Sequence, residues 1–305
     1  QRHFKDIEFQ HLIPDKDHNW INLVENDWDG MIPFVDKSAK SGSNKQTICQ
    51  LYSTGVSTNR DEWIKDVCPE ALKGRMEFFI DHYMAKDSDG DMKIKWSRNL
   101  KRRYANGLKE PYENSRIIPY NYRPFNKTYI YFSELYIDEL GLSAEMFSGQ
   151  NKVICVSSKS TVYLAVSTYA DLHYTGDTQC VPLYRFDSNS SRHDNITDWA
   201  LEQFRTHYQD ATIAKEDIFH YVYGVLHDPA YRAKYEINLK RSLPRVPFMQ
   251  DFRLWAAWGK ELMDLHLGFE SAAPYPLKIV ESPIDDDAMT KARLKADKAG
   301  GAIIL

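Results

Sequence analysis

Residues 93–127 read KIKWSRNLKRRYANGLKEPYENSRIIPYNYRPFNK and contain a predicted helix followed by a predicted strand. Ser97 is a favourable N-cap for a short helix through Tyr104, and Asn106-Gly107 is a typical helix stop. The run IIPYNY at 117–122 is rich in β-branched and aromatic residues, which is typical of a strand. The stretch therefore predicts a basic helix beside a β region.

The same stretch concentrates positive charge. It holds ten basic residues against two acids, Glu110 and Glu113, so its net charge is +8, while the whole chain is at −4 and the remainder at −12. The basic residues are Lys93, Lys95, Arg98, Lys101, Arg102, Arg103, Lys109, Arg116, Arg123 and Lys127. Such a local concentration indicates a surface that binds an anion, with nucleic acid as the leading candidate. A solvated helix face with structural ion pairs explains the charge equally well.

The composition indicates a globular protein. The chain has 305 residues, 43% of them hydrophobic and 27% charged, which is enough for a sizeable core. No run approaches about 18 apolar residues and no signal peptide is visible, so we expect a cytoplasmic protein with no membrane partner. Both ends look cut, because the chain starts at Gln1 and stops in an apolar run, so we expect a piece of a longer polypeptide.

The N-terminal part predicts short strands and one long helical region. Residues 4–13 alternate apolar and polar side chains as a half-buried strand does, 37–45 is a small, polar linker candidate, and 47–52 is a short apolar strand. From residue 61 to 86 the apolar residues recur at helical spacing. Thr58 or Asn59 would be the N-cap, and Pro69 would kink or split the helix.

The remaining chain changes from strands to helices. Five predicted strands lie at 117–122, 127–132, 152–158, 161–167 and 180–186, and Ser-Asn-Ser-Ser at 188–191 is a second linker candidate. Helices are predicted at 197–207, 215–226, 228–239 and 250–269, and a short one in the tail after 271. The predicted fold class is α+β, with a mainly β centre flanked by helices and a helical C-terminal half.

No catalytic or metal-binding motif is recognisable. The chain lacks GxxxxGK[ST], GxGxxG, HExxH and GxSxG, and NYRPF at 121–125 has the wrong spacing for the tetrapeptide of an adenine methyltransferase. Asp87, Asp89 and Asp91 resemble the start of a calcium loop, but Met92 and Arg98 occupy the positions that require Gly and Glu. We therefore expect no catalytic residue and no metal site.

The segment GVSTNR at 55–60 combines a flexible Gly with polar residues at a predicted helix N-terminus. It suits either a phosphate or base contact or a plain helix cap.

Several segments together resemble a known family. They are STGVSTNRDEW (53–63), YRPF (122–125), PLY (182–184), NITD (195–198) and YVYGVLHDPAYRAKYEINLKRSLPRVPF (221–248). In this order they are similar to the C-terminal region of Type ISP restriction-modification enzymes. Members of that family are single polypeptides with a nuclease, a helicase-like ATPase motor, a helical coupler, a gamma-class adenine-N6 methyltransferase and a C-terminal target recognition domain.

The resemblance implies that this chain is the target recognition domain. Residues 1–52 would be the closing strand and exit segment of the methyltransferase domain, 53–190 the DNA-reading part, and 191–305 the helical C-terminal part. The chain would recognise a short sequence in duplex DNA, position the target adenine for N6 methylation and license translocation and cleavage by the other domains. It would have no catalytic activity or cofactor of its own, since S-adenosylmethionine, ATP and Mg²⁺ would be bound elsewhere in the polypeptide.

The implied partners are double-stranded DNA and the methyltransferase and motor domains of the same polypeptide. We expect phosphate contacts from Lys93, Lys95, Arg98, Lys101, Arg102 and Arg103, and base or groove contacts from Thr58, Asn59, Arg60 and Arg123, with Lys127 also at the DNA. The alternative is a protein-interaction or scaffold module that packs against other domains of a larger helicase-like protein. The density of Tyr, Trp and Phe at 199–269 supports that alternative for the helical half.

Overall fold

A computed structural model describes most of the chain. The described residues are 8, 11–15, 18–21, 24, 26–41, 46–85, 94–157, 161–274, 276, 278, 295–297 and 302–304. The chain divides into two compact units, Gln1–Glu270 and Ser271–Leu305, which are treated separately below. Within the described residues, no helix is both long enough and apolar enough to cross a membrane.

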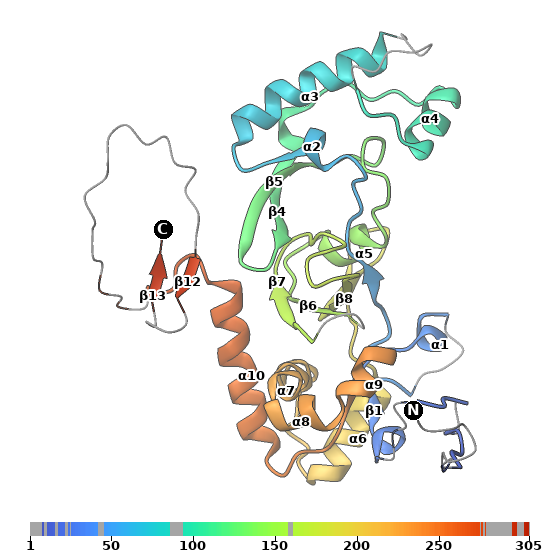
Figure 1. The fold of residues 1–305 in the computed structure, drawn as a ribbon, viewed down its shortest axis with the longest axis vertical. Helices are drawn as coiled ribbons and strands as arrows, with labels where there is room; N and C mark the ends of the chain where they lie inside the picture. The colour runs from blue at the N-terminus through green and yellow to red at the C-terminus, as the bar shows by residue number, and fades with distance from the viewer. Residues whose placement is uncertain are drawn as a thin grey trace. The chain divides into compact units, whose positions relative to one another are not determined.

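The first unit contains nearly all of the regular structure (Figure 1). Its helices are α1 (Lys37–Lys40), α2 (Asp61–Ile64), α3 (Pro69–Met84), α4 (Arg98–Ala105), α5 (Ser143–Phe147), α6 (Asp198–Tyr208), α7 (Lys215–His227), α8 (Pro229–Lys234), α9 (Glu236–Arg241) and α10 (Phe252–Leu267). Its strands are β1 (Ile32–Pro33), β2 (Ser53–Thr54), β3 (Lys65–Asp66), β4 (Ile117–Arg123), β5 (Asn126–Tyr131), β6 (Val153–Val156), β7 (Leu164–Val166), β8 (Gln179–Pro182), β9 (Tyr184–Phe186), β10 (Arg192–Asp194) and β11 (Arg245–Val246). In the second unit, β12 (Lys295–Asp297) pairs with β13 (Ala302–Ile304).

The centre of the first unit is an antiparallel sheet of four strands in the order β2-β8-β6-β7. Successive side chains of a strand point to opposite faces, and both faces of β6 are covered. Ile154 and Val156 pack in one core, whereas Val153 and Cys155 pack in another. A strand buried on both faces needs an uninterrupted apolar sequence, which explains the run Val-Ile-Cys-Val.

The larger core joins one face of this sheet to the helical half. It contains Phe204, Tyr221 and Phe252 from α6, α7 and α10, and also Phe34 and Ile48 from the N-terminal segment. β1 pairs with β11 and so ties the N-terminal segment to the residues before α10. The described residues 26–41 and 46–52 thus pack in the same core as α6–α10.

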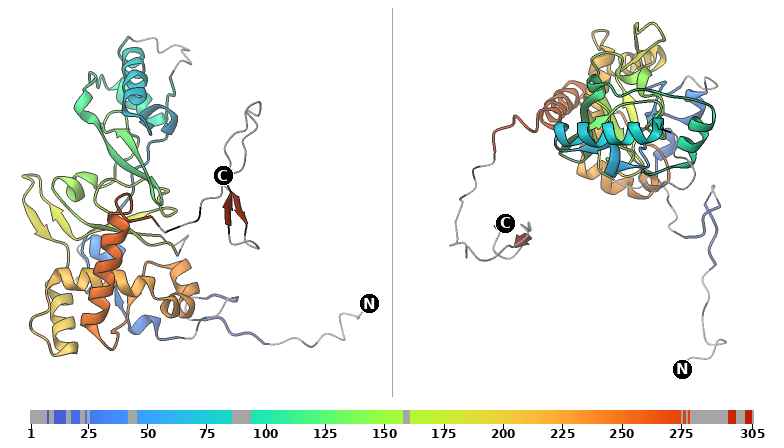
Figure 2. Two further views of the ribbon diagram at one scale, coloured as in Figure 1. Left: turned by 90° about the vertical axis from the view of Figure 1, so that its left-hand side faces the viewer. Right: turned by 90° about the horizontal axis from the view of Figure 1, so that it is seen from above.

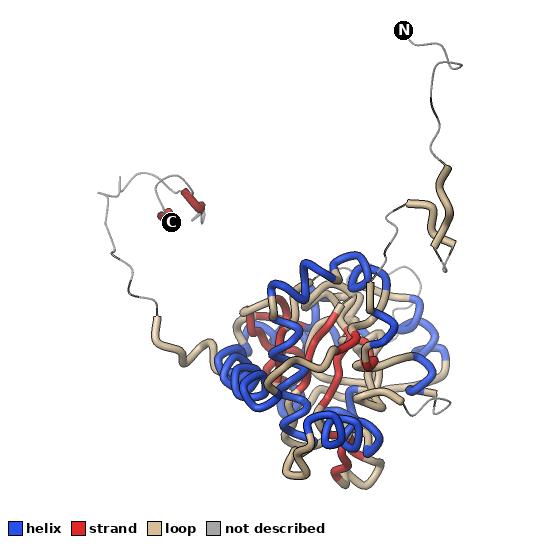
Figure 3. The backbone as a smooth tube through the Cα atoms, turned by 90° about the horizontal axis from the view of Figure 1, so that it is seen from below, coloured by secondary structure: helices blue, strands red, loops and turns tan. Residues whose placement is uncertain are grey.

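The third core lies around a sheet of three strands in the order β3-β5-β4. Leu72, Met76, Phe79 and Tyr83 of α3 recur at helical spacing, and all are completely buried in this core. In Figure 1 this region, with α4, lies above the central sheet, and α6–α10 lie below it. In the view of Figure 3 the strands (red) of this unit lie towards the middle with helices (blue) around them.

Two glycines let α7 and α10 touch along their backbones. A Cβ atom on Gly259 would lie 1.8 Å from the carbonyl oxygen of His220 and 2.8 Å from the amide nitrogen of Gly224. A Cβ atom on Gly224 would lie 2.7 Å from the carbonyl oxygen of Trp255. Only a residue without a side chain fits at these contacts, so this helix pair defines the packing of the C-terminal half.

We expect Gly259→Ala to lower the free energy of unfolding by about 3 kcal/mol, because an added methyl forces two packed helices apart. Gly74→Ala in α3 is the matched control, since nothing lies within 4 Å of its Cβ position. That control should be neutral or raise stability by about 0.5–1 kcal/mol through helix propensity. Denaturant unfolding of both variants checks this, and equal effects of the two substitutions would contradict it.

The fold class predicted from the sequence is confirmed. The structure is mixed α+β, Pro69 separates the predicted helix into α2 and α3, and Asp228 caps α8 through the amide nitrogens of Ala230 and Tyr231. The predicted helix at 228–239 is instead two helices, α8 and α9, interrupted at Tyr235.

Other predicted elements differ. The predicted strand at 47–52 contributes only an isolated bridge from Cys49 to Ile196, and the predicted linker at 37–45 begins as α1. Most of the predicted strand at 4–13 and of the predicted tail helix lies outside the described residues. The Ser-Asn-Ser-Ser linker candidate is the turn between β9 and β10, so the boundary proposed at residue 190 falls inside a hairpin.

Candidate nucleic-acid interface

Helix α4 forms for the reasons that the sequence suggests. The Ser97 hydroxyl accepts a hydrogen bond from the amide of Leu100 at 3.2 Å, and Gly107 takes the left-handed φ of +73° just after the helix. Leu100 is completely buried and so fixes which side of α4 faces the protein.

Three cations lie on the opposite side of this helix. Arg98, Lys101 and Arg102 are spaced i, i+3 and i+4, which places them on one helical face, and all three are exposed. None of their side chains makes a hydrogen bond or ion pair with any residue in the described part of the chain. This α4 face, defined as Arg98, Lys101 and Arg102, therefore presents to solvent three positive charges that no described residue pairs.

The orientation of α4 is fixed by a buried carboxylate. Asp138 Oδ1 lies 2.8 Å from Arg60 Nη2 and accepts a 2.5 Å hydrogen bond from Ser97 Oγ, and its Oδ2 accepts one from Asn59 at 3.0 Å. Burial alone would raise the pKa of Asp138, but the hydrogen bonds from Ser97 and Asn59 and the charge of Arg60 lower it. Asp138 thus stays ionised and joins the start of α2 to the start of α4.

Arg60 belongs to this network and not to the surface. Its side chain is completely buried, and besides the pair with Asp138 it donates hydrogen bonds to the Tyr136 carbonyl and to Ser97. A DNA contact from Arg60 would require this buried pair to open, at the cost of an unpaired buried charge. We therefore assign Arg60 a structural role in place of the predicted base contact.

Arg103 faces inward as well. Its guanidinium donates to the carbonyl oxygens of Leu135 at 3.1 Å, Ile137 at 2.6 Å and Asp138 at 3.0 Å. It is half-buried, next to the exposed Arg102. The predicted phosphate contact of Arg103 is replaced by a role in holding the 135–138 loop against α4.

The segment at 55–60 also differs from its expected role. Thr58 is 2% exposed and its hydroxyl donates to Asp61, while Asn59 is exposed with a left-handed φ of +56°. Gly55 serves close packing and not flexibility, because a Cβ atom there would lie 2.6 Å from the Asp171 carbonyl oxygen. The N-cap residue of α2 is Arg60, without a side-chain cap.

The hollow beside this segment is acidic. It has a volume of about 270 Å³, and its lining includes the carboxylates of Asp61, Glu62 and Asp171. Lys95 also lines it and lies 3.2 Å from Glu62. Because carboxylates outnumber cations, the charge at this short helix N-terminus does not favour the predicted phosphate contact.

The remaining predicted cations lie on the β4–β5 hairpin and have acidic partners. Arg123 Nη1 is 2.8 Å from Asp171 Oδ1, and its guanidinium stacks 3.8 Å from the Tyr122 ring centre. Lys127 Nζ is 2.6 Å from Glu270 Oε2 and lies near the Phe269 ring. These charges are largely neutralised, in contrast to the α4 face.

The β9–β10 hairpin is an exposed element that the sequence did not point to. It pairs Phe186 with Arg192 and Tyr184 with Asp194, and every residue of β10 is exposed. The left panel of Figure 2 shows this yellow hairpin standing out from the body of the first unit. Arg192 lies 4.5 Å from the Tyr184 ring centre and forms no ion pair with a described residue.

Comparison with known proteins identifies the family. A family model described as the Type ISP C-terminal specificity domain matches residues 47–305. The chain belongs to the Type ISP C-terminal specificity domain family. The resemblance expected from the sequence is thus confirmed. A comparison with curated protein sequences gave no match.

Solved structures of longer proteins contain a similar domain. A cryo-EM structure of a DrdV–DNA complex has a TM-score of 0.87 and 39% identity over 98% of this chain and 32% of that chain. The ATP-dependent Type ISP restriction-modification enzyme LlaBIII bound to DNA has a TM-score of 0.79 and 26% identity over 97% of this chain and 20% of that one. A nuclease-deletion mutant of the Type ISP enzyme LlaGI with a DNA substrate mimic has a TM-score of 0.71 and 26% identity over 92% and 22%. This specificity domain therefore spans a third or less of the chains it matches.

The specificity domain brings only some of the predicted residues together. Arg98, Lys101 and Arg102 share one exposed face, and Lys95 lies at the start of the same segment. Lys93 lies outside the described residues.

The β9–β10 hairpin had one usable signal in the sequence, because Tyr-Arg-Phe and Arg-His-Asp flank a turn rich in Asp, Ser and Asn.

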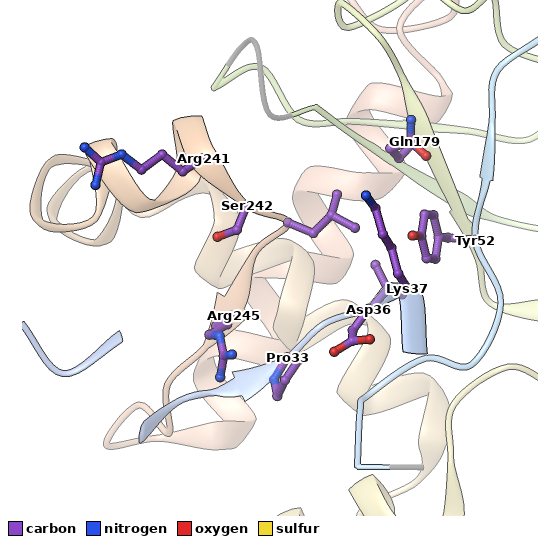
Figure 4. A pocket seen from close by; sticks show the side chains of 10 residues that line it. Pro33, Asp36, Lys37, Tyr52, Gln179, Arg241, Ser242 and Arg245 are labelled. Carbon is purple, nitrogen blue, oxygen red and sulfur yellow. The ribbon is translucent and has the colours of Figure 1, made fainter. Parts of the chain in front are cut away.

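A separate cavity of the specificity domain lies where the N-terminal segment meets the residues between α9 and α10. It has a volume of about 530 Å³, and Figure 4 shows Lys37 beside Tyr52, and Arg245 near Pro33. Arg245 donates to the Asp29 and Met31 carbonyls at 3.4 and 3.2 Å, so it closes this junction. Burial, and then the charge of Asp36, raises the pKa of Tyr52.

Among the described residues of the specificity domain, no group of three or more His, Cys, Asp or Glu side chains could hold a metal ion. His227 lies in the interior, within 2.8 and 2.9 Å of the Tyr223 and Tyr163 carbonyl oxygens, and burial lowers its pKa.

Proposed function

We propose that the specificity domain recognises a short sequence in duplex DNA and docks on it through the α4 face. The observation that carries this proposal is the set of three cations that have no side-chain partner among the described residues, on a helix whose orientation is fixed by Asp138. Cations that repel each other cost energy unless an anion binds there, and regularly spaced phosphates suit three charges on one face. The DNA bound to DrdV and LlaBIII supports the choice of anion.

In this proposal the specificity domain itself performs no chemistry. It holds the duplex so that a neighbouring domain methylates the target adenine at N6, and its binding licenses translocation and cleavage by the motor and nuclease. S-adenosylmethionine, ATP and Mg²⁺ belong to those other domains, and the setting is cytoplasmic. Residues 53–190 supply most DNA contacts, 191–305 support them, and 1–52 lead in from the methyltransferase domain.

The proposed contacts fall into two groups. Arg98, Lys101 and Arg102 bind phosphates directly, and Lys95 does so after leaving Glu62; Lys93 is kept as a predicted phosphate contact. Asn59 is exposed and keeps its proposed groove contact, whereas Thr58, Arg60 and Arg103 hold the framework. Arg123 and Lys127 contact the DNA only if its phosphates replace their acidic partners.

A second function has its own supporting observation. On α10 the side chains of Leu254, Trp258 and Leu265 are 42%, 49% and 54% exposed and follow one helical face. Exposed apolar side chains in a row favour contact with another protein surface. We propose that this face packs against other domains of the same polypeptide, which is compatible with DNA binding by α4.

Salt-titrated binding tests the proposed function. The full-length protein with duplex DNA should show a log–log slope of affinity against salt of at least about 2.7, because each phosphate contact contributes about 0.9. Fluorescence anisotropy over 50–400 mM salt measures it. A slope near zero, or no binding to duplex DNA, would reject DNA recognition and leave the protein-interaction function.

A further inference from the structure

Arg185 is a cation whose side chain has no partner among the described residues. It lies in β9, is half-buried, and its Nε atom is buried without a hydrogen-bond partner among the described residues. Its guanidinium forms no ion pair or hydrogen bond with any of them. A guanidinium carries five donors, and a buried unsatisfied donor costs about 1–3 kcal/mol. An acceptor from outside the described residues would offset this cost.

The guanidinium lies at a cavity between the β9–β10 hairpin and α5. The cavity has a volume of about 620 Å³, and its polar lining includes the hydroxyls of Ser148, Ser188 and Ser190. Phe186 anchors the hairpin, because a Cβ atom on Gly149 would lie 2.8 Å from its ring. The site is therefore built from two packed elements and not from a loose loop.

Two acidic side chains line this cavity. Asp187 accepts hydrogen bonds at 2.9 Å from the amides of Asn189 and Ser191 and lies 2.9 Å from His193 Nε2. These interactions, led by the one from His193, lower the pKa of Asp187 to about 2, so Asp187 stays ionised with its oxygens already hydrogen-bonded. Glu145 is the other carboxylate, and it is exposed at the rim.

We propose that Arg185 binds one backbone phosphodiester of duplex DNA in this cavity, with the hydroxyls of Ser188 and Ser190 as further donors. The planar guanidinium matches two phosphate oxygens, which a single lysine charge does not. The source is DNA and not a free anion, because the cavity wall is a protruding hairpin, and α4 and α5 lie on the same side of Figure 1. This inference rests on the proposed function and adds a second phosphate site to the α4 face.

Two substitutions with opposite expected signs test the site. Arg185→Gln should lower the log–log salt slope of the full-length protein by about 0.9, and its affinity for duplex DNA at 0.15 M salt by about 5-fold. Glu145→Gln should raise the affinity, because it removes a repelling charge beside the phosphate. Arg185→Lys should keep the slope but lose part of the affinity. Arg205→Gln, an exposed arginine whose Nε donates to the Ile213 carbonyl, is the matched control and should change neither quantity.

The outcomes separate this inference from the proposed function. If the unsubstituted protein binds DNA with a steep slope and Arg185→Gln leaves slope and affinity unchanged, the phosphate site is refuted and DNA recognition stands. If the unsubstituted protein does not bind duplex DNA, both fail. Saturable binding of inorganic phosphate that Arg185→Gln abolishes, with DNA binding unchanged, would assign the site to a free anion and overturn the inference. The thermal unfolding midpoint of Arg185→Gln should match that of the unsubstituted protein. If it does not, the loss of DNA affinity in Arg185→Lys is the test instead.

Discussion

Replacing Arg98, Lys101 and Arg102 together by glutamine should lower the log–log salt slope for duplex DNA by about 2.7 and the affinity at 0.15 M salt by about 100-fold. The three side chains are exposed and without partners among the described residues, so their loss removes three phosphate contacts and no internal contact. Fluorescence anisotropy with the full-length protein at several salt concentrations gives both numbers.

Two controls define what the triple variant means. Lys234, Lys240 and Lys260 lie on α8, α9 and α10 beside Asp27, Glu236 and Asp264, and their replacement by glutamine changes the net charge equally. That variant should change the slope by less than about 0.5.

Arg103→Gln should lower the free energy of unfolding by about 1.5–3 kcal/mol through its lost carbonyl contacts, with the slope unchanged. Equal slopes in the triple variant and the unsubstituted protein would remove the α4 face from the interface.

Asp138→Asn should lower the free energy of unfolding by about 3–5 kcal/mol, the usual cost of leaving a buried charge without its partner. Arg60 has no exposed surface and its Nε already lacks a hydrogen-bond partner among the described residues, so its charge cannot be moved to water. Denaturant unfolding measures the loss. Asp264→Asn, which breaks an exposed pair with Lys260, is the matched control and should cost less than about 1 kcal/mol.

The same pair predicts a pH dependence. The pKa of Asp138 is lower in the folded protein than its usual value of 3.8, so its contribution to stability is present above that value and is lost as the pH falls below it. The unsubstituted protein should therefore lose more stability than Asp138→Asn on acidification from pH 5 to pH 3. Parallel pH profiles for the two proteins would show that the pair is not the stabilising contact.

Local sequence patterns predicted the elements of the fold but not the partners of the charges. Ser97 and Pro69 act within one or two turns of their own segment, and each has the predicted role. Arg60 and Asp138 are 78 residues apart, and no local pattern indicates that they meet. The sequence did not predict the burial of Arg60 for that reason.

One part of the charge assignment could have been improved from the sequence. Leu100 is the apolar residue of α4, and helical spacing places Arg103 and Tyr104 on its side, with Arg98, Lys101 and Arg102 on the other. The structure has this division, with Arg103 half-buried. The residues predicted as a strand at 47–52 bond through their backbone to separate segments, as the Ile48 amide does to the Pro33 carbonyl and the Gln50 amide to the Asn195 carbonyl. Only Cys49 forms a β-bridge, so no continuous strand results.

The β9–β10 hairpin has a consequence for how such domains diverge. β10 buries no side chain, and the hairpin is held at its base chiefly by Phe186. Substitutions or changes of length between residues 187 and 194 therefore leave the three hydrophobic cores intact. A lineage of these domains can alter what the hairpin contacts at little cost in stability, while the sheet behind it, buried on both faces, tolerates far fewer changes.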